Sequence, residues 1–322
     1  MADFADIFTG RLITEIPPAL SAICDALKDK TSLVELDLSD NAFGSRSVDP
    51  IVPFLTHNRS FQIFKLNNNG LGPEGGAVIA NALAESARLS KEEGKPSRLR
   101  TLICGRNRLQ DGSSAAWSKA FSAHGSLVEV RMPQNGIRMD GIANLARGLA
   151  HCPHLEYLDL QDNTFGEVGS TAMAKSLPVW TQLKFLNFSD CVLSNEGEGV
   201  SAVIETIASG SNPKLQTLQL QNNNMETESF ARLAEGISKL LALKTLELQW
   251  NEVDDEEDEN LQTLVESLKQ KGGKVLLNDD EEEEEEETVT GGAEAEGKDE
   301  NAVKTSAAVD ELADLLVKTS IA

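Results

Sequence analysis

The sequence has few cysteine, histidine and aromatic residues, and it has no long apolar run. Its 322 residues include 4 cysteines, 4 histidines and 1 tyrosine. The cysteines show neither C-x-x-C spacing nor the pattern of a small disulfide-stapled domain, which favours reduced thiols inside the cell. No stretch approaches the roughly 18 apolar residues that a membrane helix needs. The acidic start MADFADIFTGR also lacks the features of a signal peptide. We therefore expect an intracellular protein that does not insert into a membrane.

Motifs of catalysis and cofactor binding are absent as well. The histidines, His57, His124, His151 and His154, form no H-E-x-x-H motif, and the chain contains neither a nucleophile elbow nor a P-loop. Residues 70–75 spell G-x-G-x-x-G. The same strand–turn–helix position recurs along the chain without these glycines, however, and there is no second half of a Rossmann sheet. The sequence thus predicts no self-contained active site, no metal site and no cofactor.

Acidic residues are in large excess and are concentrated at one end of the chain. There are 52 acidic and 29 basic residues, a formal net charge of -23, and residues 279–322 contain 16 of the acids but only 3 lysines. Such a polyanion repels nucleic acid and anionic lipid and attracts basic protein surfaces. The run of acids at residues 279–287 cannot bury enough apolar surface to offset the entropy lost on ordering. We therefore expect residues 279–322 to form a disordered acidic tail.

Four apolar residues near the end of this tail have two alternative interpretations. The segment VDELADLLVK is compatible with a short amphipathic helix that has no receptor. The same residues also have the spacing of a nuclear-export peptide, which would make an export receptor a partner. The sequence does not choose between the two. The residues are Val309, Leu312, Leu315 and Val317.

A nine-residue pattern, L-x-x-L-x-L-x-x-N, returns eight times with conservative replacements. Successive copies are 28 residues apart, except for two intervals of 38 and 32 residues. This period is typical of a long leucine-rich repeat with one strand and one helix in each unit. We predict an α/β solenoid, a ribonuclease-inhibitor-like crescent with parallel strands on its concave face and helices outside. The copies end at Asn41, Asn69, Asn107, Asn135, Asn163, Cys191, Asn223 and Asn251.

Two domains follow from these patterns: a solenoid over residues 1–278 and the acidic tail over residues 279–322. The chain starts within what reads as a strand unit, so the first repeat is expected to be incomplete. The extra ten residues of the 38-residue interval fall in the polar segment RLSKEEGKPSR, residues 88–98. We expect this segment to bulge from the surface as a loop.

The three consecutive asparagines at residues 67–69 are the candidate site that the residues alone suggest. Asn69 is the regular repeat asparagine, and periodicity alone favours a structural role for it. The glycines and proline at residues 70–73 predict a tight turn with small side chains. Such a turn would let a partner approach the backbone closely.

Five segments carry a resemblance to a known family. They are DIFTGR (residues 6–11), LSDNAFG (38–44), KLNNNGLGPEGG (65–76), LRTLICGRNRL (99–109) and MPQNGIR (132–138). An unrelated leucine-rich repeat would share the leucine and asparagine positions but not FTGR or NNNGLGP. The segments closely resemble the Ran GTPase-activating proteins, and the likeness covers nearly the whole chain.

The resemblance implies an activator that works in trans on Ran bound to GTP. The GTPase hydrolyses GTP slowly because its own glutamine is poorly placed to orient the attacking water. In this family an asparagine that matches Asn69 orders that glutamine, without an arginine finger. Arg11 matches an arginine that supports the interface, with a structural ion pair as an equal alternative. The other contacts expected with Ran, which a Ran-binding protein can accompany, are Asp40, Asn68, Arg106 and Arg108.

The resemblance also implies a location and a form of the protein. Keeping cytoplasmic Ran in its GDP form gives nuclear transport its direction, so a cytoplasmic, perinuclear location is expected. The sequence lacks the repeats that usually precede DIFTGR, the long carboxy-terminal domain of animal members and the amino-terminal domain of plant members. We expect a short form of the fungal or protist kind.

Two other functions remain open from the residues. An acidic repeat protein can serve as a binding scaffold or chaperone for basic proteins such as histones, although repeats of that class are shorter, at roughly 22–25 residues. A ligand can also be seated on the concave face, as in ribonuclease inhibitor, on a mixed set of residues with few aromatic anchors. That set is Glu129, Arg131, Tyr157, Asp159, Gln219 and Glu247.

Overall fold

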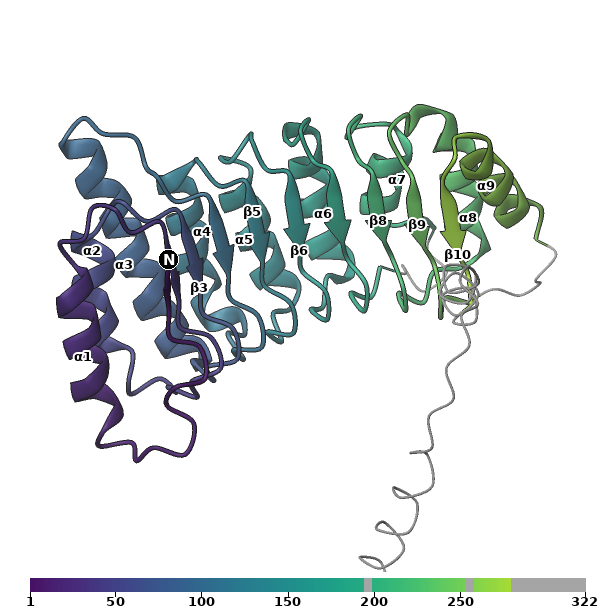
Figure 1. Ribbon diagram of the computed structural model, residues 1–322. Coiled ribbons are helices and arrows are strands. Elements are labelled where there is room, and N and C mark those ends of the chain that lie inside the picture. Colours follow the sequence, from purple (N-terminus) through teal and green to yellow (C-terminus); the bar gives the residue numbers. More distant parts are fainter. Residues whose placement is uncertain (194–198, 253–257, 279–322) are drawn as a thin grey trace, which may run out of the picture. The chain divides into compact units, whose positions relative to one another are not determined.

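The protein is a stack of strand–helix units built on one sheet. The computed structural model describes residues 1–193, 199–252 and 258–278, and Met1–Asn278 form one compact unit. Within the described residues, ten parallel strands follow one another in the order of the sequence (Figure 1). The strands are β1 (Ala2–Asp3), β2 (Glu35–Asp37), β3 (Ile63–Lys65), β4 (Thr101–Ile103), β5 (Glu129–Arg131), β6 (Tyr157–Asp159), β7 (Phe185–Asn187), β8 (Thr217–Gln219), β9 (Thr245–Glu247) and β10 (Lys274–Leu276).

Helices lie along one side of this sheet, and neighbouring helices pack on each other in sequence order (Figure 1). Packed helices are about 8–10 Å apart, whereas paired strands are about 4.8 Å apart. The strand side is therefore the concave side of the stack. The predicted leucine-rich-repeat solenoid is confirmed. The helices are α1 (Ile16–Leu27), α2 (Val52–His57), α3 (Gly72–Glu92), α4 (Ser114–His124), α5 (Met139–Leu149), α6 (Gly166–Ser176), α7 (Ala202–Ala208), α8 (Thr227–Gly236) and α9 (Glu259–Gln270).

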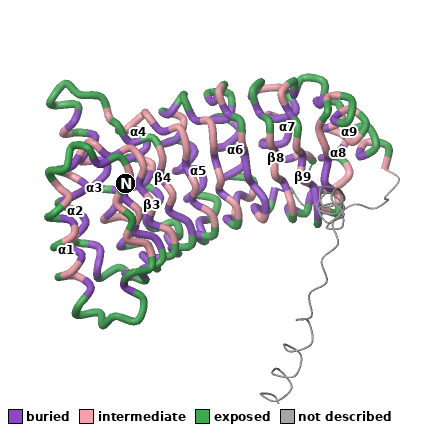
Figure 2. The backbone as a smooth tube through the Cα atoms, in the orientation of Figure 1, coloured by how far each residue is buried: buried purple, intermediate pink, exposed green. Residues whose placement is uncertain are grey.

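Alternation within each strand builds the core. The middle residue of every strand from β2 to β9 is buried, and the residue before it lies on the open face. Strand pairing places Leu36, Phe64 and Leu102 beside one another. The helices complete the core with stripes three and four residues apart, such as Ile142 and Leu145 of α5. Figure 2 shows the buried positions between the strand and helix layers.

The repeat asparagines form a hydrogen-bonded ladder where the chain leaves each strand. Asn107 is typical: its Nδ2 donates to the carbonyls of Leu66 and Gly105 at 2.7 and 3.0 Å. Its backbone N–H donates to Asn135 Oδ1 at 3.0 Å. These bonds satisfy backbone groups that the turn would otherwise leave buried without partners. Cys191 takes this position in its own repeat, where burial raises the pKa of its thiol.

The long interval before Asn107 is only partly a loop, which corrects the prediction for residues 88–98. Helix α3 continues to Glu92. Arg88 pairs with Glu85 and Glu92 on the same helix face, and these pairs favour an additional turn. The chain turns away just after the helix at Gly94, whose φ of +68° suits a glycine and whose N–H donates to Lys91 O.

Among the helices of the described ranges, none is long and apolar enough to cross a membrane. The predicted disordered tail lies outside the described residues. So does the alternative export motif formed by Val309, Leu312, Leu315 and Val317. These statements therefore remain predictions.

Candidate functional site

One residue of each repeat projects from the edge where strands turn toward helices. This residue precedes the ladder asparagine and has a left-handed backbone, with φ between 51° and 62° in the repeats of β2 to β5. Its N–H continues the strand pairing, as when Asn68 N donates to Gly105 O at 2.9 Å. The side chain then points away from the core. We call Asp40, Asn68, Arg106 and Gln134 the N-terminal rim, and Asp162, Asp190, Asn222 and Trp250 the C-terminal rim.

Asn69 lies inside the ladder, and this contradicts the prediction that it is presented to a partner. Its exposed fraction is 0%. Its Nδ2 donates to Leu38 O and Asn67 O, both at 2.9 Å, and its Oδ1 accepts from Asn41 N at 3.1 Å. Ladder asparagines of other repeats, such as Asn107 and Asn223, make equivalent bonds. The carboxamide of Asn69 is therefore fully used within the fold.

Asn68 is the residue of the triplet whose carboxamide is exposed on the rim. Its Nδ2 donates to Asp40 Oδ1 at 2.9 Å. Asn67 is tied down instead, since its Oδ1 accepts from Gly105 N at 2.6 Å. Asp40 therefore fixes the orientation of Asn68 and leaves the Asn68 carbonyl oxygen on the surface.

The segment that contains FTGR lies against the same rim. The N–H groups of Ile7 and Phe8 donate to the ladder residue Asn41 at 2.9 and 3.0 Å. The hydroxyl of Thr9 donates to Asp6 Oδ1 at 2.6 Å and lies 3.2 Å from Asp40 O. Arg11, a few residues further on, is exposed. Sequence-distant segments thus meet beside Asp40 and Asn68.

Arg11 makes no ion pair with any residue that the structure describes. The structural ion pair that the sequence left open as an alternative is not seen in these parts of the chain. The guanidinium of Arg11 is therefore available to a partner.

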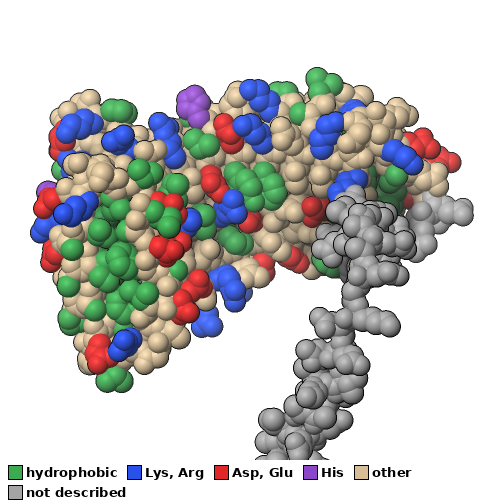
Figure 3. Space-filling model, in the orientation of Figure 1, with side chains coloured by type: hydrophobic (Ala, Val, Ile, Leu, Met, Phe, Trp, Pro, Cys, Tyr) green, Lys and Arg blue, Asp and Glu red, His purple; other side chains and the backbone are tan. Residues whose placement is uncertain are grey.

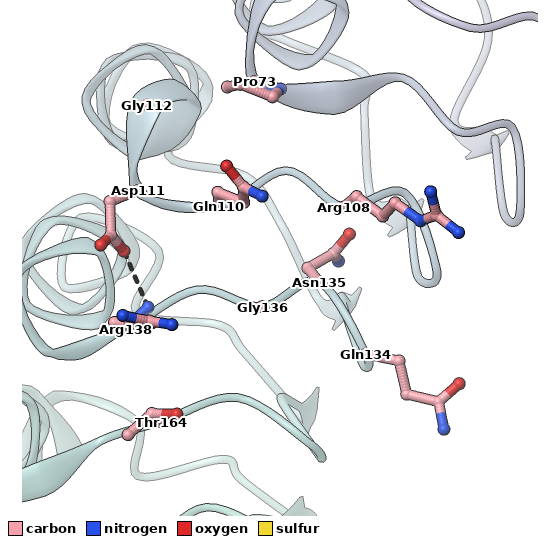
Figure 4. A pocket seen from close by; sticks show the side chains of 10 residues that line it. All are labelled: Pro73, Arg108, Gln110, Asp111, Gly112, Gln134, Asn135, Gly136, Arg138 and Thr164. Atoms are coloured by element: carbon pink, nitrogen blue, oxygen red, sulfur yellow. Dashed lines mark hydrogen bonds between the residues drawn. The ribbon is translucent and has the colours of Figure 1, made fainter.

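A hollow of about 650 Å³ opens beside the N-terminal rim (Figure 4). Its walls come from the turns that lead into α3, α4 and α5. Asp111 reaches across it, and its Oδ1 accepts from the backbone N–H of Arg138 at 2.7 Å. Gly141 allows this approach, because a Cβ there would lie 2.3 Å from Asp111 Oδ1. The lining residues are Pro73, Arg108, Gln110, Asp111, Gly112, Gln134, Asn135, Gly136, Arg138 and Thr164.

Three exposed arginines give this region positive charge in a chain whose net charge is -23. Arg106, Arg108 and Arg138 form no ion pair within the described residues. An unpaired guanidinium keeps its five donors for an acceptor on another molecule. The rim is therefore suited to a protein surface that presents carboxylates or carbonyls.

All five residues predicted to contact a partner lie along this region: Arg11, Asp40, Asn68, Arg106 and Arg108. Sequence reasoning missed Gln134 and Arg138. A signal existed for both, because they belong to the segment MPQNGIR, which lies one repeat further along the same edge. Across the described ranges, no group of three His, Cys, Asp or Glu residues is placed to hold a metal ion.

Comparison with known proteins gives two findings. The "Leucine Rich repeat" family model matches residues 29–52, 57–80 and 151–174. Ran GTPase-activating protein 1 of Saccharomyces cerevisiae is 37% identical over 263 residues, which is 80% of this chain and 64% of the yeast protein.

Two animal proteins match over shorter regions. Ran GTPase-activating protein 1 of Xenopus laevis is 48% identical over 137 residues, 42% of this chain and 24% of the frog protein. Ran GTPase-activating protein 2 of Caenorhabditis elegans is 45% identical over 141 residues, 43% of this chain and 15% of the worm protein. The chain thus spans less than two thirds of the length of each of these relatives.

Proposed function

Because the chain belongs to the family of Ran GTPase-activating proteins, we propose that it stimulates GTP hydrolysis by the small GTPase Ran. Ran in its GTP form is the partner, alone or with a Ran-binding protein. The observation that carries this proposal is the exposed Asn68 carboxamide, oriented by Asp40 and flanked by unpaired arginines. These groups can act only on a reacting centre that another molecule brings to them.

In this proposal Asn68, rather than the buried Asn69, orders the catalytic glutamine of the GTPase. A GTPase of this class holds GTP and magnesium itself and lacks only a well-oriented glutamine and water. A carboxamide offers two donors and an acceptor, so it can fix another carboxamide without adding charge. The bond to Asp40 holds Asn68 in place before the partner arrives, so less entropy is lost on binding.

The arginines act as contacts of the interface and not as a finger that enters the nucleotide site. Arg106 and Arg108 lie one repeat beyond Asn68, and on the other side Arg11 follows the segment in which Ile7 and Phe8 donate to Asn41. A partner seated over Asn68 reaches these guanidinium groups at its edges. Charges at the border of an interface mainly raise the rate of association.

The proposal includes a cytoplasmic, perinuclear site of action, where the activator would keep Ran in its GDP form and give nuclear transport its direction. It also includes the acidic tail as a segment that attracts basic patches on partners, an effect that salt weakens. Binding of the tail by a nuclear-export receptor is a separate proposal.

Single-turnover hydrolysis of GTP on Ran, with the activator in catalytic amounts, tests the central claim. Asn68→Ala should lower the stimulated rate about 100- to 1,000-fold, the range seen when one preorganised hydrogen-bond donor is removed from an active site. Asn222→Ala is the matched control, because Asn222 occupies the same rim position and donates to Asp190. Equal activity of Asn68→Ala and the parent protein would refute the mechanism, and no stimulation by the parent would refute the function.

A further inference from the structure

A three-membered stack stands on the concave strand face, away from the rim. Tyr157 of β6 is covered from the β5 side by the guanidinium of Arg131, whose Cζ lies 4.1 Å from the ring centroid. On the β7 side the ring of Phe185 lies 3.9 Å away, with an interplanar angle of 5°. The pairing register places Phe185 directly beside Tyr157 and, on its other side, beside Thr217.

The stack is unusual for its place in the repeat. The strand position of Tyr157 and Phe185 is held by threonine on three other strands, at Thr101, Thr217 and Thr245. Tyr157 is the only tyrosine in the chain. Both rings are partly exposed. The buried core of the described residues, on the other side of the sheet, is formed by other side chains. Neither ring is needed to fill that core, so their exposed surface calls for another explanation.

Phe185 ends the stack with one ring face toward a short side chain. Tyr157 covers the β6 side of the ring, while the β8 neighbour is Thr217. A threonine is too short to cover an aromatic ring in the next strand. The β8 side of Phe185 is therefore the place where a flat group from another molecule can stack.

The charges around the stack are mainly acidic. Glu129 holds Arg131 through its Oε1, at 2.6 Å from Nε and 2.5 Å from Nη2. Asp159 lies beside the stack, and burial raises the pKa of its carboxyl. Beyond Phe185, Glu247 accepts from Gln219 Nε2 at 2.8 Å.

The other end of the strand face has the same character. Lys65 is paired with Glu35 at 2.6 Å and with Asp37 at 3.7 Å. Two carboxylates thus surround one ammonium group, and the net charge of the cluster is negative. Figure 3 shows a hydrophobic cluster in the middle of this face, bordered by acidic and basic side chains. The strand face therefore combines an aromatic surface with an excess of carboxylates over amines and guanidinium groups.

We propose that this face binds a basic segment of a second protein, with one arginine of that segment stacked on Phe185. The stack would then have a guanidinium at each end, with Arg131 on Tyr157 and the partner's arginine on Phe185. A guanidinium is attracted to the negative face of an aromatic ring, and it is weakly hydrated, so it stacks at little cost in solvation. Asp159 lies on the strand next to Phe185 and Glu247 lies two strands away on the same face, and both carboxylates favour a positively charged chain. This site is separate from the Asn68 rim and does not depend on the proposed action on Ran.

Fluorescence anisotropy with the full chain tests the site, using a labelled ten-residue peptide of alternating arginine and glycine. Phe185→Thr copies the residue found at the equivalent position of three other strands. It should weaken binding about five- to thirtyfold, the range expected for loss of a partly desolvated cation–ring contact. Trp250→Thr is the control, because it removes an aromatic side chain that is 61% exposed on the rim. Binding by this control should match the parent protein.

A second pair of measurements separates the strand face from the acidic tail. A variant in which the acids of residues 279–287 are replaced by their amides should bind more weakly but keep its dependence on Phe185. The proposal is overturned if the parent does not bind the peptide, or if Phe185→Thr binds as well as the parent. A glutamine-for-arginine peptide that binds equally well would also overturn it. Stimulation of Ran should be the same for Phe185→Thr and the parent, so the two proposals can fail independently.

Discussion

The two rims share one local geometry and differ in what surrounds it. On the N-terminal rim, Asn68 donates to Asp40 at 2.9 Å. On the C-terminal rim, Asn222 donates to Asp190 at 2.5 Å. The two asparagines have φ angles of 51° and 49°. An oriented carboxamide at this position is thus a product of the repeat and occurs twice.

The surroundings give each carboxamide its distinct character. Beside Asn68 stand Arg106 and the segment whose residues Ile7 and Phe8 donate to Asn41. Beside Asn222 stands Trp250, an exposed aromatic residue. The backbone therefore supplies a presented side chain in each repeat, and the neighbouring charges determine which partner it can meet.

The ladder asparagines should matter equally in both halves, because their role is structural. Asn69→Ala leaves the buried N–H of Asn41 without its acceptor, whereas Leu38 O keeps the bond from Asn41 Nδ2. One unsatisfied buried group costs about 1–3 kcal/mol, so we expect a loss of about 2 kcal/mol in the free energy of unfolding. Asn223→Ala should cost a similar amount. Urea unfolding followed by circular dichroism measures the free energy of unfolding of both variants. If Asn69→Ala is as stable as the parent protein, the ladder is not required at this position.

Substitution of the aspartates on the two rims should have very different effects on the stimulated hydrolysis rate. Asp40→Ala removes the acceptor that orients Asn68, and we expect the stimulated hydrolysis rate to fall about tenfold, or about 1.4 kcal/mol. Asp190→Ala removes the same bond from Asn222 and should leave the rate within about twofold. If both variants lose activity equally, the effect is on folding and not on the site. Asp40→Asn, which keeps an acceptor oxygen, should recover part of the loss.

The arginines of the N-terminal rim should affect association more than hydrolysis. Arg106→Ala and Arg108→Ala should each raise the KM for Ran about threefold to fivefold with little change in kcat, because unpaired charges at an interface border steer encounter. The effect should shrink as salt rises. Arg232→Ala is the control, since that arginine is paired with Glu205 at 2.7 Å on the helix side. A change in kcat instead of KM would assign the arginines to the reacting centre.

The sequence predicted the solenoid because its leucines and asparagines repeat at a fixed period. The same period favoured Asn69 over Asn68, the residue whose carboxamide we propose acts on Ran. Asn69 fits the repeat, and a residue that fits the repeat is the one that the fold buries. Asn68 projects because the residue before each ladder asparagine has a left-handed backbone, and this conformation depends on pairing with the next repeat. The extension of α3 is likewise favoured by the ion pairs of Arg88 with Glu85 and Glu92, which have no counterpart in the repeat pattern.

The two halves of the solenoid should also differ in how much stability they lose as the pH falls. This is the smallest of the expected effects. Burial lowers the pKa of His124 in α4 to about 4, below the ordinary value of about 6.5. Between these values the unfolded chain binds a proton that the folded protein does not. Stability is therefore complete above pH 6.5 and falls as the pH drops toward 4.

Between pH 7.5 and 6.0 the expected loss from His124 is about 0.5–1 kcal/mol. It should appear in the opening free energies of α3 and α4, because Ser97 before β4 and the α3–α4 contact enclose the ring. Helix α8 contains no histidine and should respond less. Amide exchange corrected for intrinsic rates measures both regions, with His124→Gln as the variant that lacks the titrating group. If α4 in that variant remains as acid-sensitive as in the parent, the proton is bound elsewhere, and the halves do not differ through this residue.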